Sequence, residues 1–294
     1  MDANDGLPPR ERRWAVLSLA IAISLVVVDM GMANVALPTI GRELGASPSA
    51  SIWIVNAYQV AVTVSLLPLA ALGDIVGYRR IYIGGLVLFT ACAVVSATAE
   101  SMPVLIAARL AQGFGAAGVM SVNTALVRYV YPRAKLGQGV GINSLVVATG
   151  SAAGPTVAAA VLSVANWPWL FAIAVPFGLV ALVFAIWFLP HMAGSGHRFD
   201  VPSAVLSVAT LGLLLASVDG IAHDGGLLVP LSLSVAIVAG WLFVRRQRRL
   251  PVPMLPVELF WRPTFSLSVA TAIAAYMAQS LAIVSLPFFF IAVA

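Results

Sequence analysis

Nine apolar stretches, each long enough to cross a lipid bilayer, dominate this sequence of 294 residues. A helix needs about 20 mostly apolar residues to cross roughly 30 Å of hydrocarbon. The chain is 61% hydrophobic and only 9% charged, whereas soluble domains carry about 25% charged residues. No period-two alternation typical of membrane strands is present. The sequence therefore predicts an all-α integral membrane protein of about nine transmembrane helices, over residues 14–38, 52–72, 81–99, 103–126, 139–165, 169–189, 201–219, 227–244 and 264–290.

The positive charges fall almost entirely on one side of this predicted topology. Loops rich in arginine and lysine stay in the cytoplasm. If the N-terminus is cytoplasmic, fourteen of the sixteen basic residues lie inside, Arg42 lies outside and Arg109 lies within a span. The inside residues are Arg10, Arg12, Arg13, Arg79, Arg80, Arg128, Arg133, Lys135, Arg198, Arg245, Arg246, Arg248, Arg249 and Arg262. We expect a multi-pass protein of the cell membrane, plasma or inner, and no nucleic-acid partner, because this charge excess reflects orientation.

Loop lengths divide the predicted spans into three groups. Residues 1–190 hold six spans joined by short loops, which predicts an N-terminal domain. A polar break with Gly and Pro, residues 190–202, leads to two inserted spans within residues 191–250. Residues 251–294 then begin a C-terminal domain. Because the sequence stops in the apolar run LPFFFIAVA, we expect a truncated chain.

Two ionisable side chains, Asp29 and Arg109, lie deep within predicted spans. Each is expected to cost about 2.5–3.5 kcal/mol near the bilayer centre, so such groups face a bundle interior or a water-filled cavity and find a partner. At about 1.5 Å per residue, Asp29 lies roughly 14 Å and Arg109 roughly 9 Å below the outer face. The two side chains can therefore pair if their helices are neighbours.

Such a pair has two interpretations. It could simply fix helix packing as a static ion pair. Alternatively, Asp29 could carry protons, because burial favours the neutral acid whereas a nearby arginine favours the carboxylate. Moving Arg109 or admitting water would then switch Asp29 between its two forms.

Two stretches of small residues predict close contacts between helices. LIAARLAQGFGAAG, residues 105–118, places Gln112 on the same helix face as Arg109. GSAAGPTVA, residues 150–158, has Gly150 and Gly154 four residues apart, followed by Pro155. Small residues at this spacing let neighbouring helices approach closely. Taken alone, the pattern indicates only helix contact with a proline bend.

The short inside loop LGDIVGYRR, residues 72–80, carries a further acid at a helix end. Asp74 opposes the helix dipole there, so a cationic partner or a helix N-terminus would explain its presence. Arg79 or Arg80 can supply that charge, and Gly77 permits the tight turn. An ordinary solvated loop is the alternative.

Together these stretches resemble the major facilitator superfamily, and within it the fourteen-helix drug:proton antiporter branch. DMGMANVALP resembles the first-helix signature at Asp29, Asn34 and Pro38, and ARLAQGFGAA is similar to the fourth-helix motif, with its basic residue at Arg109. GSAAGP resembles the antiporter motif of the fifth helix at Gly150, Gly154 and Pro155. In the loop motif Asp74, Gly77, Arg79 and Arg80 match, while Ala70, Ile75 and Tyr78 replace an expected Gly, Arg and Arg.

The resemblance implies a secondary active transporter that exports drugs or other lipophilic small molecules in exchange for protons, by alternating access. Asp29 and Arg109 would couple transport to protons, and Asp74, Gly77, Arg79, Arg80, Gly150, Gly154 and Pro155 would serve conformational change. The implied partners are a small-molecule substrate, protons and the lipid bilayer, with a monomer expected at full length. Candidate substrate-cavity residues are Asn34, Asn56, Tyr58, Gln59, Gln112 and Asn143, and for each an interhelical hydrogen bond is an equal alternative.

Other classes of function are compatible with the same sequence. An uptake symporter and a non-transporting membrane sensor or assembly partner are the alternatives. An enzyme is not expected, because the sequence has no HExxH motif and no intramembrane Asp pair, and His191, His197 and His223 lie in loops. With Cys92 as the single cysteine, no Cys-based metal site and no cofactor are expected.

Overall fold

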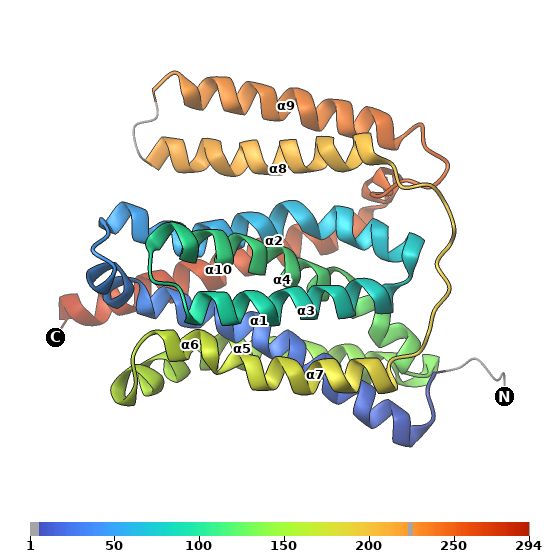
Figure 1. Cartoon of the computed structure of the whole chain (residues 1–294). Coiled ribbons are helices and arrows are strands. Elements are labelled where there is room, and N and C mark those ends of the chain that lie inside the picture. The colour runs from blue at the N-terminus through green and yellow to red at the C-terminus, as the bar shows by residue number, and fades with distance from the viewer. Residues whose placement is uncertain (1–5, 223–225, 294) are drawn as a thin grey trace.

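The computed structural model describes residues 6–222 and 226–293, and every regular element in those residues is a helix. The long helices run roughly parallel or antiparallel to one another (Figure 1). In chain order they are α1 (Pro9–Glu43), α2 (Pro48–Val76), α3 (Tyr78–Ala97), α4 (Met102–Val130), η1 (Arg133–Lys135), α5 (Leu136–Val164), α6 (Pro168–Ala172), α7 (Ala174–Phe188), α8 (Val201–Ala222), α9 (Leu228–Gln247), η2 (Val257–Trp261) and α10 (Pro263–Val293).

The helices confirm the predicted all-α membrane bundle. In the part of the chain that is described, eight helical segments are long and apolar enough to cross a membrane, counting α6 and α7 together. The ninth predicted span falls in α10, where Pro263–Ala278 form a shorter apolar helix. Most helices extend beyond the predicted spans at one end or both, because the backbone hydrogen bonding of a helix continues into the polar residues outside its apolar run.

The helix ends follow local chemistry. Pro9 and Pro48 stand in the first turns of α1 and α2, where a missing N–H leaves no hydrogen bond unmade. The Ser47 hydroxyl caps α2 by accepting from the Ala50 N–H at 3.2 Å. One difference from the sequence prediction is a break at Ile173, which divides the expected span 169–189 into α6 and α7.

Two helices, α1 and α4, occupy the centre of the six-helix group formed by α1–α7. Helix α4 packs against α2 and α3, whereas α1 packs against α5 and α7. Glycines allow the closest of these approaches: a Cβ atom on Gly115 of α4 would lie 2.5 Å from the backbone nitrogen of Phe89 on α3. This arrangement places one face of α1 opposite one face of α4.

The helices α8 and α9 form a pair beside this group (Figure 1). The hydroxyl oxygens of Ser217 and Ser232 lie 2.8 Å apart between them, and α8 packs against α2. The linker before α8, residues 189–200, is not helical, as predicted for the polar break. The division into three domains stays a prediction.

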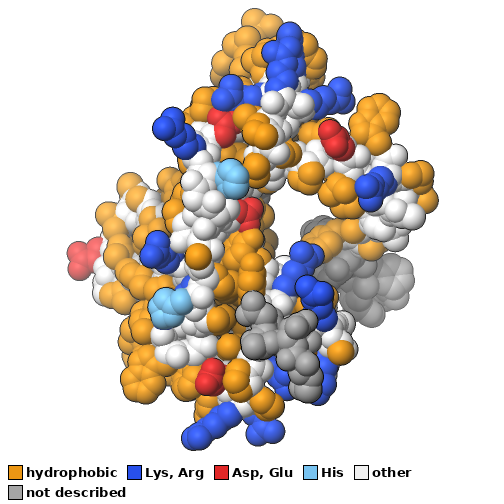
Figure 2. Space-filling view, turned by 90° about the vertical axis from the view of Figure 1, so that its right-hand side faces the viewer, with side chains coloured by type: hydrophobic (Ala, Val, Ile, Leu, Met, Phe, Trp, Pro, Cys, Tyr) orange, Lys and Arg blue, Asp and Glu red, His pale blue; other side chains and the backbone are white. Residues whose placement is uncertain are grey.

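Most basic loops lie at one end of the bundle, which we call the basic end. It comprises the start of α1, the turn after α2, η1, the linker 189–200 and the loop after α9. Figure 2 looks onto this end, where Lys and Arg side chains are spread over the surface.

Candidate functional site

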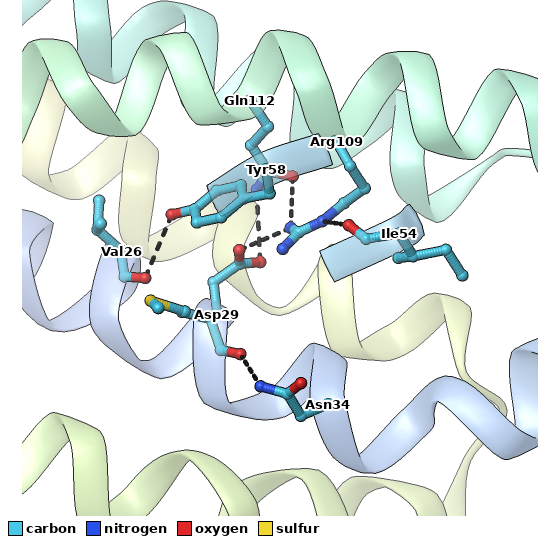
Figure 3. A network of polar contacts seen from close by, with 8 residues as sticks. Val26, Asp29, Asn34, Ile54, Tyr58, Arg109 and Gln112 are labelled. Atoms are coloured by element: carbon cyan, nitrogen blue, oxygen red, sulfur yellow. Dashed lines mark hydrogen bonds and ion pairs between the residues drawn. The ribbon is translucent and has the colours of Figure 1, made fainter. Parts of the chain in front are cut away.

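The centre of the bundle holds an ion pair between α1 and α4. Arg109 Nη1 donates to Asp29 Oδ2 at 2.6 Å, and each side chain is only 1% exposed (Figure 3). The contact that the depths of these residues predicted is therefore present. Burying two charges without water is tolerable because each neutralises the other and both are hydrogen-bonded.

Gln112, one turn further along α4, joins the pair. Its Oε1 accepts from Arg109 Nη1 at 2.8 Å, and its Nε2 donates to Asp29 Oδ1 at 3.4 Å. Gln112 is fully buried, so these three side chains satisfy one another rather than water. Both carboxylate oxygens of Asp29 thus have a donor.

Aromatic rings enclose the guanidinium group. The Cζ atom of Arg109 lies 4.3 Å from the ring centroid of Tyr58 on α2 and 5.3 Å from that of Phe171 on α6. Rings at such distances stabilise a cation and keep water away from it. Arg109 Nε also donates to the Ile54 carbonyl at 3.4 Å, and the Tyr58 hydroxyl donates to the Val26 carbonyl at 3.4 Å (Figure 3).

The pair lies where two apolar clusters meet. Val26, three residues before Asp29, belongs to a cluster toward the basic end, and Met32, three residues after it, belongs to a second cluster toward the other end. Leu105 and Ala116 flank Arg109 and divide between the clusters in the same way. The ion pair is thus a buried polar group between two apolar clusters.

The fifth-helix glycines lie against the α1 turn that carries Asp29. A Cβ atom on Gly154 would lie 3.0 Å from the Gly31 Cα and 3.2 Å from the Val28 carbonyl oxygen. A Cβ atom on Gly150 would lie 3.5 Å from a Val27 methyl group, which is an ordinary contact. Sequence reasoning missed Gly31, although a glycine two residues after a buried acid was a usable signal of close helix approach.

The loop motif has partners that local spacing did not single out. The Asp74 carboxylate accepts from the Tyr78 hydroxyl, and among the described side chains it forms no ion pair with Arg79 or Arg80, which the sequence allowed as possible partners. Arg79 instead bonds to the His191 ring and the Ile186 carbonyl, and Arg80 donates to the Val76 carbonyl at 3.4 Å. Tyr78, which stands where the family motif has an arginine, thus supplies the hydrogen-bond donor for the Asp74 carboxylate.

The loop motif also holds the linker that leads to α8. The Ser195 N–H donates to the Asp74 carbonyl oxygen at 2.8 Å. Gly77 has φ of 100°, and a Cβ atom there would lie 2.7 Å from the Met192 carbonyl oxygen. A Cβ atom on Gly194 would lie 1.8 Å from the Ile75 carbonyl oxygen, so the two backbones are in direct contact.

The six candidate cavity residues do not share one environment. Tyr58 and Gln112 contact Arg109, as described above. Asn143 on α5 accepts from Asn123 Nδ2 at 2.6 Å, which is the interhelical hydrogen bond considered as the alternative. Asn34 is exposed and donates to the Met30 carbonyl of its own helix at 3.1 Å, away from the Asp29 carboxylate (Figure 3). Asn56 and Gln59 are half-buried on α2.

Within the described residues, the His, Cys, Asp and Glu side chains do not gather into a metal site. His191 and His197 lie in the linker before α8, while His223 lies outside the described residues. No group of three or more His, Cys, Asp or Glu residues within the described ranges is placed to hold a metal ion.

Comparison with known proteins decides the family. The sequence profile of the Major Facilitator Superfamily matches residues 19–294. The chain belongs to this superfamily. The uncharacterized transporter YebQ of Escherichia coli K12 is 52% identical over 288 residues, which are 97% of this chain and 63% of YebQ. Membership of this transporter superfamily confirms that the chain is not an enzyme.

More distant superfamily relatives differ in what their names say they move. The multidrug efflux pump LfrA of Mycolicibacterium smegmatis is 32% identical over 88% of this chain and 52% of LfrA. The riboflavin transporter RibZ of Clostridioides difficile is 27% identical over 95% of this chain and 61% of RibZ. The chain therefore spans between about half and two-thirds of the length of these relatives.

Solved structures of the superfamily share the fold. The human organic anion transporter MFSD10 gives a TM-score of 0.52 at 20% identity, over 71% of this chain and 55% of that protein. A bacterial homologue of the lysosomal transporter Spinster, inward-facing and unoccupied, gives a TM-score of 0.51 at 15% identity, over 83% of this chain and 65% of that protein. At these identities the likeness establishes the fold alone.

Proposed function

We propose that this chain belongs to a secondary active transporter that exports lipophilic small molecules, such as drugs, in exchange for protons. The observation that carries the proposal is the buried contact of Asp29 with Arg109 and Gln112. Among the relatives, the name of the multidrug efflux pump LfrA supports this substrate class.

Asp29 is the proton carrier in this proposal. While Arg109 lies 2.6 Å from it, the carboxylate is neutralised by an ion pair and needs no proton. If α1 and α4 separate or water enters, Asp29 loses this neutralisation, and a proton bound to one carboxylate oxygen replaces it. Arg109 and Gln112 are positioning residues that set when this exchange happens.

Alternating access supplies the separation of the helices. Superfamily transporters contain inverted repeats that rock around a central site, and α1 and α4 occupy equivalent places in two such repeats. We assign conformational roles to the loop residues Asp74, Gly77, Arg79 and Arg80 and to the fifth-helix residues Gly150, Gly154 and Pro155. The substrate cavity would be lined from the candidate residues Asn34, Asn56, Tyr58, Gln59, Gln112 and Asn143.

The organisation proposed for the whole protein follows the sequence prediction. Residues 1–190 form the N-terminal domain, residues 191–250 the two inserted helices, and residues 251–294 the start of the C-terminal domain. The basic end faces the cytoplasm of a plasma or inner membrane, and the transporter acts as a monomer.

Transport by the protein encoded by the complete reading frame tests this proposal. Proteoliposomes with an imposed proton gradient are loaded with a lipophilic cationic dye, and dye movement and proton flux are followed together. The expected result is dye export with proton entry for wild type, and loss of both for Asp29→Asn. Glu100→Gln, which removes an exposed acid between α3 and α4, is the control for protein quality.

Each contrary outcome has a clear meaning. Normal coupled export by Asp29→Asn would show that the ion pair is static and would overturn the assignment of Asp29. Dye and protons moving in the same direction would replace the exporter with an uptake symporter. No movement of any tested lipophilic cation or neutral drug by well-folded wild type would favour a sensor or assembly partner.

A further inference from the structure

The face of α9 that points away from the bundle is apolar over the helix and basic at its C-terminal end. Helix α9 buries Ala236, Ala239 and Phe243 within the bundle. On the opposite face, Val238 is 56% and Trp241 is 58% exposed. Because α9 is long and apolar enough to span a membrane, exposed apolar side chains on it contact lipid tails rather than water.

Three arginines continue this outer face at the basic end. Arg245, Arg248 and Arg249 are all exposed and follow Trp241 at helical spacing. The helical turn is maintained by the Arg248 N–H, which donates to the Val244 carbonyl at 3.2 Å. Figure 2 shows Lys and Arg side chains gathered at the top of the molecule, over this end of α9.

Trp241 fixes the depth of these arginines. Its ring lies 5.2 Å from the Arg245 Cζ atom. Tryptophan prefers the level of the lipid headgroups, where its ring meets both hydrocarbon and water. The guanidinium groups just beyond it are therefore at the depth of the lipid phosphates.

Arg246, on the same helix, differs from these three arginines because an acid of the chain neutralises its charge. Its Nη2 donates to Asp200 Oδ1 at 2.7 Å and its Nε to Asp200 Oδ2 at 3.0 Å. Among the described side chains, Arg245, Arg248 and Arg249 form no ion pair with an acid. Their charge is thus available to a partner outside the chain.

We propose that the outer face of α9 at the basic end binds anionic phospholipid, with Arg245, Arg248 and Arg249 contacting its phosphate. The guanidinium fork matches phosphate oxygens in pairs, which strengthens the contact and orients it. The apolar stripe of Val238 and Trp241 lies directly below, where the acyl chains of the same lipid run. This inference rests on the membrane span of α9 and not on proton coupling or export.

Lipid titration of the purified full-length protein in neutral detergent tests the surface. Native mass spectrometry measures binding of phosphatidylglycerol and of phosphatidylcholine to wild type and to the triple variant Arg245→Gln/Arg248→Gln/Arg249→Gln. We expect wild type to prefer phosphatidylglycerol. The triple variant should lose about tenfold or more of that affinity, because each arginine near an anionic surface contributes severalfold.

A second triple variant provides the matched control. Arg10→Gln/Arg13→Gln/Lys135→Gln removes the same number of charges from the basic end but none from α9. It should keep phosphatidylglycerol affinity within about twofold of wild type, and both variants must elute as monodisperse protein. Equal binding of the two lipids by wild type, or equal losses in the two triple variants, would overturn the proposal.

Discussion

Gly31 and Gly154 lie in backbone contact where α1 crosses α5, two residues from the acid that pairs with Arg109. The contact joins the antiporter-like motif of the fifth helix to the turn of α1 that carries Asp29. Any rocking of α5 therefore presses on, or releases, the backbone next to the ion pair. This relationship gives the fifth-helix glycines a physical connection to Asp29.

Gly154→Ala should separate α1 from α5 and disturb the ion pair. The new Cβ atom would meet the Gly31 Cα at 3.0 Å, and backbone atoms cannot turn away as side chains do. Overpacking of this kind costs about 1–3 kcal/mol, so a lower unfolding temperature and slower coupled transport are expected. Gly137→Ala is the control on the same helix, because no atom beyond the adjacent backbone of its own helix lies within 4 Å of its Cβ position. Equal behaviour of the two variants would show that the close contact has no consequence.

Arg109→Ala should destabilise the protein more than the loss of both charges does. Removing Arg109 leaves the Asp29 carboxylate buried without its cation, which costs about 3–5 kcal/mol. In the double variant Asp29→Asn/Arg109→Gln no charge remains, so part of the stability should return. Unfolding followed by tryptophan fluorescence in detergent measures the difference. A double variant that is less stable than Arg109→Ala, as two independent losses would make it, would contradict the coupling of the two residues.

The sequence predicts some contacts of this site and not others. The depths of Asp29 and Arg109 follow from helix rise, and burial of charge demanded a partner, so their contact was predictable. The contact of Gly31 with Gly154 was not, because it depends on which helix faces lie together. The break at Ile173 had a signal that sequence reasoning missed, because Pro176 has no N–H to donate to the Ala172 carbonyl one turn earlier.

The loop partners show another limit of sequence reasoning. Proximity in the chain suggested that Arg79 or Arg80 pairs with Asp74, yet the Tyr78 hydroxyl takes that place. Arg79 turns to His191, which is 112 residues away in the sequence. Local spacing could not predict this contact, because it depends on the linker before α8 returning to the end of α2.

Gly194→Ala should detach that linker from the loop motif. A Cβ atom on Gly194 would lie 1.8 Å from the Ile75 carbonyl oxygen, so the backbone must move, and the hydrogen bond from Ser195 to Asp74 should break. Limited trypsin digestion after Arg198 should then become faster than in wild type. Gly141→Ala, at an open position on α5, should leave cleavage unchanged. Unaltered cleavage in Gly194→Ala would mean that the linker is held elsewhere.

The ion pair of Asp200 with Arg246 at the basic end should make the free energy of unfolding depend on pH. Hydrogen bonds from Arg246 hold the pKa of Asp200 below its usual range. A depressed carboxyl pKa means that the stabilisation is present at neutral pH, and is lost as the pH falls through the pKa of folded Asp200. The unfolding temperature of Arg246→Gln should therefore lie slightly below that of wild type at pH 7, and the difference should vanish in acid. A difference that grows on acidification would contradict this role for the pair.

Proton release on substrate binding is the measurement that tests the central claim, that Asp29 exchanges its proton during transport. The complete protein in weakly buffered detergent solution is mixed with a lipophilic cationic substrate, and a pH indicator follows the protons released. We expect the substrate to displace the proton from molecules in which Asp29 has separated from Arg109 and is protonated. Wild type and Glu100→Gln should therefore release protons and Asp29→Asn should release none, although that variant still binds the substrate. Equal proton release from Asp29→Asn and wild type would show that another group carries the proton and that the pair with Arg109 is structural.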